Sequence, residues 1–202
     1  MSFFENTRKP AGLGGKIMVV MMNIGHSFVA RWGLRFLKLS SDAKVLDCGC
    51  GGGANIKRLL KKCPAGIVNG IDYSAVSVEK SKKVNKEAVA NGHCEILHGS
   101  VADMIFADNR FDTVTAFETV YFWQDLPQCF REVWRVLKPG GIFFICNESN
   151  GDTDKDEKWT KIITGMTIYK DTELKAYLEQ AGFHDVQAYK NKMGWLCVTA
   201  KK

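Results

Sequence analysis

The apolar and polar positions of the chain fall into alternating blocks that predict strands and helices in turn. Short apolar runs are separated by longer amphipathic stretches, with glycine, asparagine or aspartate at the junctions, which is the pattern of strands connected by helices. The expected strands are 44–48, 67–71, 93–98, 111–117 and 141–147, and the expected helices are 54–62, 75–90 and 126–137. This alternation predicts an α/β fold, with a doubly wound, mostly parallel sheet and helices on both of its faces.

The C-terminal part of the chain adds one more helix and a pair of strands. Residues 142–146 are a continuous apolar run, as expected of a strand that is covered on both faces. The polar stretch 150–158 is either an exposed loop or the start of a helix that contains Trp159. The last expected elements are a helix over 172–181 that stops at Gly182, and a closing hairpin of 184–190 and 195–200.

The first 40 residues precede the first strand, and we expect them to form an arm and a helical cap of the same domain as the core, residues 41–202. Residues 1–12 are polar with little pattern, which indicates a loose arm. The apolar stretch 17–22 predicts one or two helical turns and is too short to cross a bilayer. A break at 23–26 separates it from a second helix that ends near Leu37.

A glycine-rich segment follows the first strand directly. Residues 45–53 read Val-Leu-Asp-Cys-Gly-Cys-Gly-Gly-Gly, and the next helix begins straight after them. Glycine brings bare backbone close to a ligand, and the amides of the helix N-terminus face the same crevice. We therefore expect a nucleotide-type cofactor at the carboxyl end of this strand.

Asp47 favours one class of cofactor over another. A carboxylate beside the turn would repel the pyrophosphate of a nicotinamide cofactor, whereas the sulfonium and ammonium groups of S-adenosylmethionine tolerate it or use it. Gly49, Gly51 and Ala54 also satisfy the loose dinucleotide pattern. A dinucleotide-dependent oxidoreductase therefore stays open as an alternative.

Asp72 ends the second expected strand, 19 residues after Gly53. An acidic residue at about this distance binds the ribose hydroxyls in folds of this kind, because two carboxylate oxygens can accept from a vicinal diol. The alternative is that Asp72 caps the following helix, although Ser74 is the better placed cap.

These motifs together resemble the class I S-adenosylmethionine-dependent methyltransferases, over residues 41–202. The segment 45–53 looks like the first motif of that family, 70–74 the second, 99–103 the adenine-contacting stretch, 111–118 the fourth strand with its loop, and 137–141 the turn before the fifth strand. The resemblance implies a seven-stranded sheet whose last strand is inserted antiparallel. It also implies a set of cofactor-binding residues: Asp47, Gly49, Gly51, Gly53, Asp72, Tyr73, Ser74, Ser100, Val101, Ala102, Phe117 and Glu118. Many relatives carry aspartate where Ser100 stands, so serine or the neighbouring backbone would have to contact the adenine.

The methyl acceptor is expected beyond the fourth strand and under the N-terminal cap. Methyl transfer from a sulfonium depends on positioning and on exclusion of water, so the absence of a catalytic dyad does not argue against an enzyme. The expected acceptor pocket contains Asn23, His26, Tyr121 and Trp123, with His26 and Tyr121 as candidate catalytic residues. The alternatives are that His26 caps a helix or lies on the surface, and that Trp123 anchors its loop to the core.

Composition narrows the class of protein further. The chain has 202 residues and a net charge of +6, but no basic run of the kind that marks a nucleic-acid surface. Its seven cysteines show no repeated spacing, which favours reduced thiols in a cytoplasmic protein over disulfides or a zinc site, and we expect no metal. The sequence predicts a cytoplasmic S-adenosylmethionine-dependent methyltransferase with a small-molecule acceptor and neither nucleic-acid nor membrane partners. A regulatory module that binds the cofactor without catalysis is the other alternative.

Overall fold

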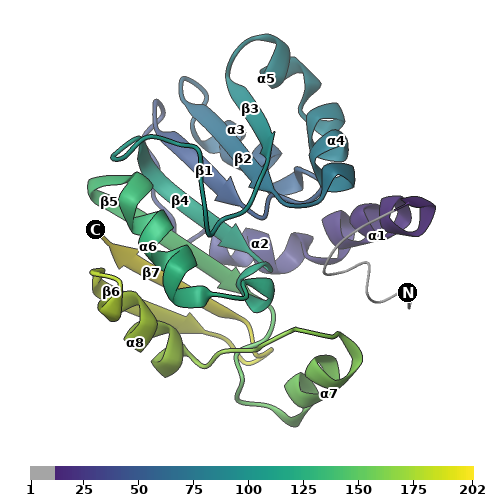
Figure 1. Cartoon of the computed structure of the whole chain (residues 1–202), viewed down its shortest axis with the longest axis vertical. Helices are drawn as coiled ribbons and strands as arrows, with labels where there is room; N and C mark the ends of the chain where they lie inside the picture. Colours follow the sequence, from purple (N-terminus) through teal and green to yellow (C-terminus); the bar gives the residue numbers. More distant parts are fainter. Residues whose placement is uncertain (1–11) are drawn as a thin grey trace.

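The computed structural model of the protein describes residues 12–202, apart from a few side chains within the helices at 12–25 and 154–162. Its centre is a seven-stranded sheet in the order β3-β2-β1-β4-β5-β7-β6 (Figure 1). Strands β1 to β5 are parallel, and β7 runs antiparallel between β5 and β6. The strands are β1 Lys44–Cys48, β2 Ile67–Asp72, β3 Cys94–His98, β4 Phe111–Phe117, β5 Leu137–Asn147, β6 His184–Lys190 and β7 Leu196–Lys201. The predicted fold class and the antiparallel last strand are confirmed.

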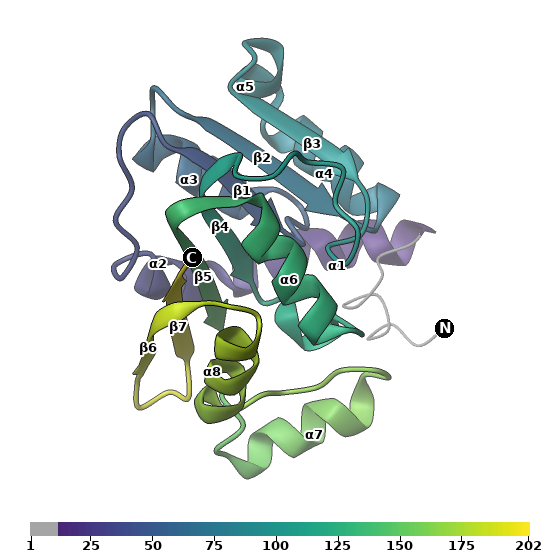
Figure 2. The ribbon, with the colours of Figure 1, turned by 60° about the vertical axis from the view of Figure 1, so that its left-hand side comes forward.

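Helices cover both faces of this sheet. They are α1 Gly12–Gly25, α2 Ser27–Gly33, α3 Ala54–Lys62, α4 Ala75–Val84, α5 Lys86–Ala90, α6 Leu126–Val136, α7 Asp154–Ile162 and α8 Asp171–Gln180. In Figure 1, α6 and α8 lie on the near face, and Figure 2 shows α7 standing apart from the sheet below α8. Among residues 12–202, no helix is both long enough and apolar enough to cross a membrane.

Alternation along each strand divides the apolar side chains between two cores. In β1, Val45 belongs to the core under α2 and α3, and Leu46 to the core under α6 and α8. Successive side chains of a strand point to opposite faces, so a strand that is apolar at every position is covered on both sides. The first core includes Ile56 and Phe144, and the second includes Phe130.

Four predicted boundaries were wrong. The fifth strand begins at Leu137 rather than at 141, because Leu137 already pairs with Phe111, and the turn expected at 137–141 is an irregularity inside β5. The break expected at 23–26 is confined to His26, because α1 continues to Gly25. The second helix ends at Gly33, where a Cβ atom would lie 3.3 Å from the ring of Phe144. The helix expected over 75–90 divides at Asn85, whose side-chain amide donates to the carbonyl oxygens of Gly53 and Ser81, each at 3.0 Å.

The order of the strands fixes where a site can form. The chain leaves β1 toward β2 and β3 on one side and reaches β4 and β5 on the other, so β1 and β4 flank the switch point of the sheet. Loops that follow neighbouring parallel strands on either side of such a point diverge and leave a crevice. The glycine loop after β1 and the loop after β4 therefore face each other there.

Candidate active site

A cavity of about 460 Å³ opens at the carboxyl ends of β1, β2, β4 and β5. Its walls come from the glycine loop, the first turn of α3, the start of α2, the segment around α7 and the turn between β6 and β7. Its lining includes the side chains of His26, Arg58, Asp72, Tyr73, Phe117, Glu118, Tyr121, Phe122, Glu148, Asp156, Trp159 and Trp195. One end of this cavity is built around the loop after β1, and the other around the loops after β4 and β5.

The glycine loop is held against the end of β2 by its own backbone. The amides of Gly49 and Cys50 donate to the carbonyl oxygen of Ile71 at 2.8 and 3.1 Å. Gly49 and Gly51 both have left-handed backbone angles, with φ of +71° and +51°. A Cβ atom on Gly49 would collide with the side chain of Thr119, whereas one on Gly51 would meet no atom within 4 Å. Gly51 therefore presents bare backbone to open space, which suits a ligand that approaches the chain closely.

Asp72 ties the end of β2 to this loop. One of its carboxylate oxygens accepts from the amide of Gly51 at 2.9 Å, and the other accepts from the amide of Ser74 at 2.8 Å. Ser74 itself caps α4 by accepting from the amide of Ser77. Burial raises the pKa of Asp72, while the two amide donors and the charge of His98 oppose that rise. The carboxylate lines the cavity with lone pairs still available, as a ribose diol would require.

Asp47 lies beneath the loop rather than on the cavity wall. Its side chain is only 1% exposed and accepts a hydrogen bond from the hydroxyl of Thr115 at 2.7 Å. Burial raises the pKa of Asp47 to about 7; the bond from Thr115 opposes this rise, and the charge of Asp72 adds to it. The side chain of Asp47 thus bonds β1 to β4 just before the loop, and its contact with a cofactor stays a prediction.

The predicted adenine contacts lie outside the cavity. Ser100 is exposed, and its hydroxyl accepts from the amide of Ala102 at 3.2 Å, while Val101 is buried. Gly53, at the start of α3, packs against Ser81 and is also outside. Tyr73, the predicted cofactor-binding residue that follows Asp72, does line the cavity and is 38% exposed.

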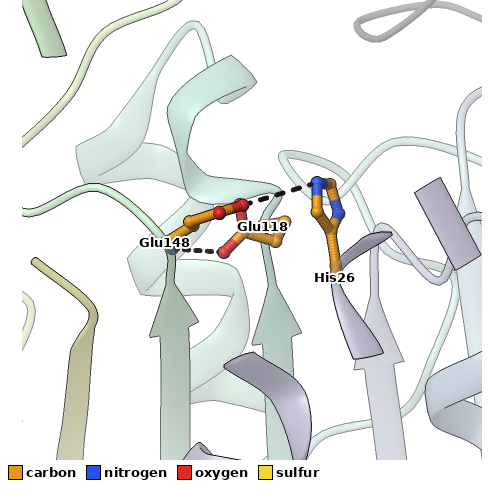
Figure 3. A group of neighbouring side chains, drawn as sticks. All are labelled: His26, Glu118 and Glu148. Atoms are coloured by element: carbon orange, nitrogen blue, oxygen red, sulfur yellow. Dashed lines mark hydrogen bonds and ion pairs between the residues drawn. The ribbon is translucent and has the colours of Figure 1, made fainter. Parts of the chain in front are cut away.

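The other end of the cavity is formed by the loops after β4 and β5. Glu118 has a left-handed backbone, with φ of +58°, and its amide donates to the carbonyl oxygen of Cys146 at 2.9 Å. Its carboxylate accepts from the amide of Glu148 (Figure 3). The pKa of Glu118 is raised well above its usual range, first by burial and then by the charge of Glu148. The two carboxylates thus lie side by side at the ends of adjacent strands.

Tyr121 is locked into this end by its hydroxyl group. The amide of Ser149 donates to that hydroxyl at 2.9 Å, and the hydroxyl is 3.3 Å from the carbonyl oxygen of the same residue, to which it donates. Burial, followed by the charge of Glu118, raises the pKa of Tyr121 well above its usual value. The phenol therefore keeps its proton at neutral pH, and its hydroxyl is engaged with the backbone of Ser149.

His26 reaches the same end of the cavity from the N-terminal cap. Its Nε2 atom lies 3.9 Å from a carboxylate oxygen of Glu148, and burial lowers its pKa. Trp123 does not reach the cavity: it is 8% exposed, stacks on Phe143 at 6.3 Å and donates to the hydroxyl of Thr119. Trp123 is therefore the loop anchor of the alternative interpretation. The side chain of Asn23 lies outside the described residues.

Several lining residues were missed from the sequence. Glu148 follows an apolar strand, as Asp72 does, and the same rule applied to β5 would have found it. Trp159 and Trp195 come from α7 and from the turn before β7, where no pattern points to a site. The charged residues that line the cavity are mostly acidic. Arg58, on α3, has a permanent positive charge, and the carboxylates are those of Asp72, Glu118, Glu148 and Asp156.

A second, shallower groove lies between α2 and α3. The structure brings together cationic side chains that the sequence shows as scattered, which are Arg31, Arg35, Lys38, Lys57, Arg58, Lys61 and Lys62. Arg58 lines both depressions; the other six cationic side chains line the groove alone, and the four carboxylates line the main cavity. The main cavity is the acidic one.

Comparison with known proteins gives consistent results. The family described as a methyltransferase domain matches residues 46–145. The chain is 35% identical to cycloartenol-C-24-methyltransferase 1 of Oryza sativa subsp. japonica over 102 residues, 50% of this chain and 29% of that protein. It is 31% identical to cycloartenol-C-24-methyltransferase of Arabidopsis thaliana over 156 residues, 73% of this chain and 46% of that protein. The chain thus spans less than half the length of either relative.

Solved structures share the fold at low sequence identity. A SAM-dependent methyltransferase from Aquifex aeolicus aligns with a TM-score of 0.75 at 19% identity, covering 92% of this chain and 97% of the other. Geranyl diphosphate C-methyltransferase from Streptomyces coelicolor A3(2) aligns with a TM-score of 0.72 at 16% identity, covering 87% and 75%. That protein was crystallised with Mg²⁺, geranyl-S-thiolodiphosphate and S-adenosyl-L-homocysteine.

Proposed function

Because the chain belongs to the class I S-adenosylmethionine-dependent methyltransferases, we propose that it is an active enzyme that methylates a small molecule. In this proposal the cofactor binds at the glycine-loop end of the cavity, which we call the cofactor end. The acceptor binds at the end formed by the loops after β4 and β5, which we call the acceptor end. The family uses S-adenosylmethionine as its methyl donor, and its sulfonium supplies the methyl group.

The observation that carries the proposal is that both ends belong to one cavity. Gly51 and Asp72 line it together with Glu118, Tyr121 and His26. A ligand held by the loop and a second ligand held between β4 and β5 would therefore meet without an intervening wall. Such contact is the main requirement for an in-line displacement, which depends on placing donor and acceptor in line.

Residues of the cofactor end fit the donor chemically. The exposed backbone of Gly51, the carboxylate of Asp72 and the ring of Tyr73 would hold the adenosine and methionine parts. The carboxylate of Asp72 at this end, within a cavity whose lining is mainly acidic, suits a cofactor with cationic groups and disfavours the pyrophosphate of a dinucleotide. The oxidoreductase alternative is therefore not favoured.

The acceptor end supplies walls and polar groups rather than a complete catalytic dyad. The rings of Phe117, Tyr121 and Phe122 line it, and aromatic faces both attract a sulfonium methyl group and exclude water. Burial lowers the pKa of His26, so that its imidazole is neutral and can accept a proton from an acceptor that must lose one. Of the two candidate catalytic residues, we therefore assign this role to His26, and a positioning role to Tyr121.

A small acceptor is supported by the size of the cavity and by the names of the relatives. A volume of about 460 Å³ falls in the range of ordinary ligand pockets. Sterol and terpenoid acceptors are named for several relatives, including squalene methyltransferase 1 of Botryococcus braunii. The N-terminal cap, proposed as residues 1–40, contributes His26, Val29 and Ala30 to the wall.

Two measurements test the proposal. Calorimetric titration should show that S-adenosyl-L-homocysteine binds and that NAD does not. A screen of hydroxyl, thiol, amine and olefinic compounds with radiolabelled S-adenosylmethionine should then find a methylated product. Binding of the cofactor without transfer to any acceptor would favour the regulatory module, and binding of NAD alone would contradict the proposal.

A further inference from the structure

Three side chains at the acceptor end converge from distant parts of the sequence. His26 stands between α1 and α2, Glu118 follows β4, and Glu148 follows β5. One nitrogen or oxygen atom of each lies within 4.8 Å of the other two. Figure 3 shows the imidazole facing the two carboxylates, which extend from the ends of adjacent strands. The three groups therefore surround one point on the wall of the cavity.

The charge of this cluster is not balanced by the protein. The two carboxylates are close enough to repel each other, and in the part of the chain that the structure describes neither forms an ion pair with a lysine or an arginine. Cationic residues are not scarce, because the chain has 28 lysines and arginines against 22 acidic residues. The missing positive charge is thus a local feature that a bound cation would supply.

We propose that His26, Glu118 and Glu148 bind a divalent first-row metal ion at the acceptor end of the cavity. Carboxylate oxygens suit Mg²⁺, Ca²⁺ and Mn²⁺, and imidazole suits transition metals. A site with one imidazole and two carboxylates combines these preferences, and Mn²⁺ satisfies both. The ligands are spread over more than 120 positions, which is why no spacing in the sequence indicated a metal.

The geometry is close to that of a site ready to accept an ion. Two ligands that are each about 2.1 Å from one ion lie roughly 3 to 4.2 Å apart. The Nε2 atom of His26 and the nearest oxygen of Glu148 are already 3.9 Å apart. The amide of Glu148 donates to one oxygen of Glu118 and orients its carboxylate, as hydrogen bonds around metal ligands commonly do. Small side-chain rotations would bring the remaining donors into range.

An ion bound there would also contact the methyl acceptor. This part of the inference rests on the proposed function. Three protein ligands leave coordination positions open, and these would face the cavity. An acceptor with a hydroxyl or enol oxygen could occupy one of them and be oriented, with the pKa of that oxygen lowered by the ion. With the ion bound, the imidazole of His26 is a ligand, and the lowered pKa of the acceptor replaces the base role proposed for His26 in the metal-free protein. The inferred acceptor class is therefore a small molecule with an oxygen close to the methylated atom.

Titration with Mn²⁺ alone tests the site without any methyl donor or acceptor. The electron paramagnetic resonance signal of aqueous Mn²⁺ falls as the ion binds, so the titration counts bound ions directly. We expect one equivalent bound to the full chain. Glu118→Gln, Glu148→Gln and His26→Gln should each weaken binding by at least about tenfold. Glu87→Gln, on the exposed first turn of α5, is the matched control and should bind as the unaltered protein does.

The outcomes separate the possibilities. Absence of a bound equivalent at millimolar Mn²⁺ would overturn the proposal, as would unchanged affinity in Glu148→Gln and His26→Gln. If Glu118→Gln does not fold, Glu148→Gln decides the matter, because its side chain is 54% exposed. Binding of an alkylammonium ion, but not of Mn²⁺, in a manner that requires Glu118 would show an organic-cation site and would also overturn it. Stoichiometric Mn²⁺ binding without methyl transfer would leave the metal site standing and contradict the proposed function alone.

Discussion

The two ends of the cavity are built in different ways. At the cofactor end, the wall is formed mainly by backbone groups. Amides of the glycine loop donate to Ile71 and Asp72, and the backbone of Gly51 faces open space without a side chain. All of these groups come from one short stretch, residues 47–74. At the acceptor end, side chains form the surface, and they come from His26, from the loops after β4 and β5, and from Trp195. Changes of backbone shape should therefore abolish cofactor binding, whereas side-chain changes at the acceptor end should alter catalysis and leave cofactor binding intact.

The largest effect is expected at Gly51. Gly51→Val places a branched side chain in the space where the cofactor would contact the backbone, and it strains a left-handed conformation. We expect affinity for S-adenosyl-L-homocysteine to fall by about a thousandfold or more, corresponding to about 4 kcal/mol, as measured by calorimetry.

Gly140→Val is the matched control. Gly140 has φ of +75°, a Cβ atom there would also meet no atom within 4 Å, and the residue is not part of the cavity wall. Equal loss of binding in both variants would mean that strain, not steric exclusion, is responsible. Gly49→Val is less informative, since its Cβ atom would displace Thr119.

The second effect concerns the pH dependence of stability. The pKa of Asp47 is about 7 in the folded protein and 3.8 when unperturbed, so the folded state holds a proton that the unfolded chain has released. Stability should fall as pH rises from about 4 to about 7, by on the order of 4 kcal/mol. Asp47→Asn removes this titration, and urea unfolding of the variant should show a flatter pH profile over that window. Identical profiles for the two proteins would contradict the account of Asp47 as a buried carboxyl group with a raised pKa.

Asp72→Ala should produce the third effect. It removes the proposed acceptor for the ribose and the observed acceptor for the amides of Gly51 and Ser74. Affinity for S-adenosyl-L-homocysteine should fall tenfold to a hundredfold, about 1.5–3 kcal/mol. Asp72→Asn keeps the size and one acceptor oxygen, and should lose less. An unchanged dissociation constant in Asp72→Ala would remove the residue from the cofactor end.

Much of this end could be predicted from the sequence because its signals are local. Strand, glycine run and helix follow one another in 45–62, and the structure has β1 and α3 where the pattern expects them. Asp72 was found by its distance from the glycines and lies on the cavity wall. The stretch 100–102 follows the motif pattern but lies outside the cavity, because a motif fixes order along the chain and not the direction of each side chain.

The acceptor end was harder to predict because its residues meet only through the topology of the sheet. Glu118 and Glu148 become neighbours because β4 pairs with β5, a pairing that no local pattern encodes. Tyr121 and Trp123 occupy the same aromatic loop, and only the packing decides that one faces the cavity and the other packs on Phe143. Trp195 reaches the cavity from the turn between β6 and β7, because β7 pairs directly with β5.

The smallest effect on binding is expected at Tyr121. Tyr121→Phe removes the hydroxyl that bonds to the backbone of Ser149 and keeps the aromatic wall. We expect the free energy of unfolding to fall by about 1 kcal/mol and the affinity for S-adenosyl-L-homocysteine to change less than about threefold, within about 0.7 kcal/mol. The rate of methyl transfer should fall by more than about threefold, that is, by more than the change in cofactor affinity. A large loss of cofactor affinity would break the distinction between the two ends of the cavity.

The central claim is that one cavity holds the methyl donor at the glycine loop and leaves its other end for the acceptor. A crystal structure of the protein with S-adenosyl-L-homocysteine tests this most directly. The account predicts the ribose hydroxyls within hydrogen-bonding distance of Asp72, the methionine part against Gly51, and the sulfur facing Tyr121 and Glu118. A cofactor bound elsewhere, or one that fills the space between His26 and Glu148 with its adenine, would contradict the account.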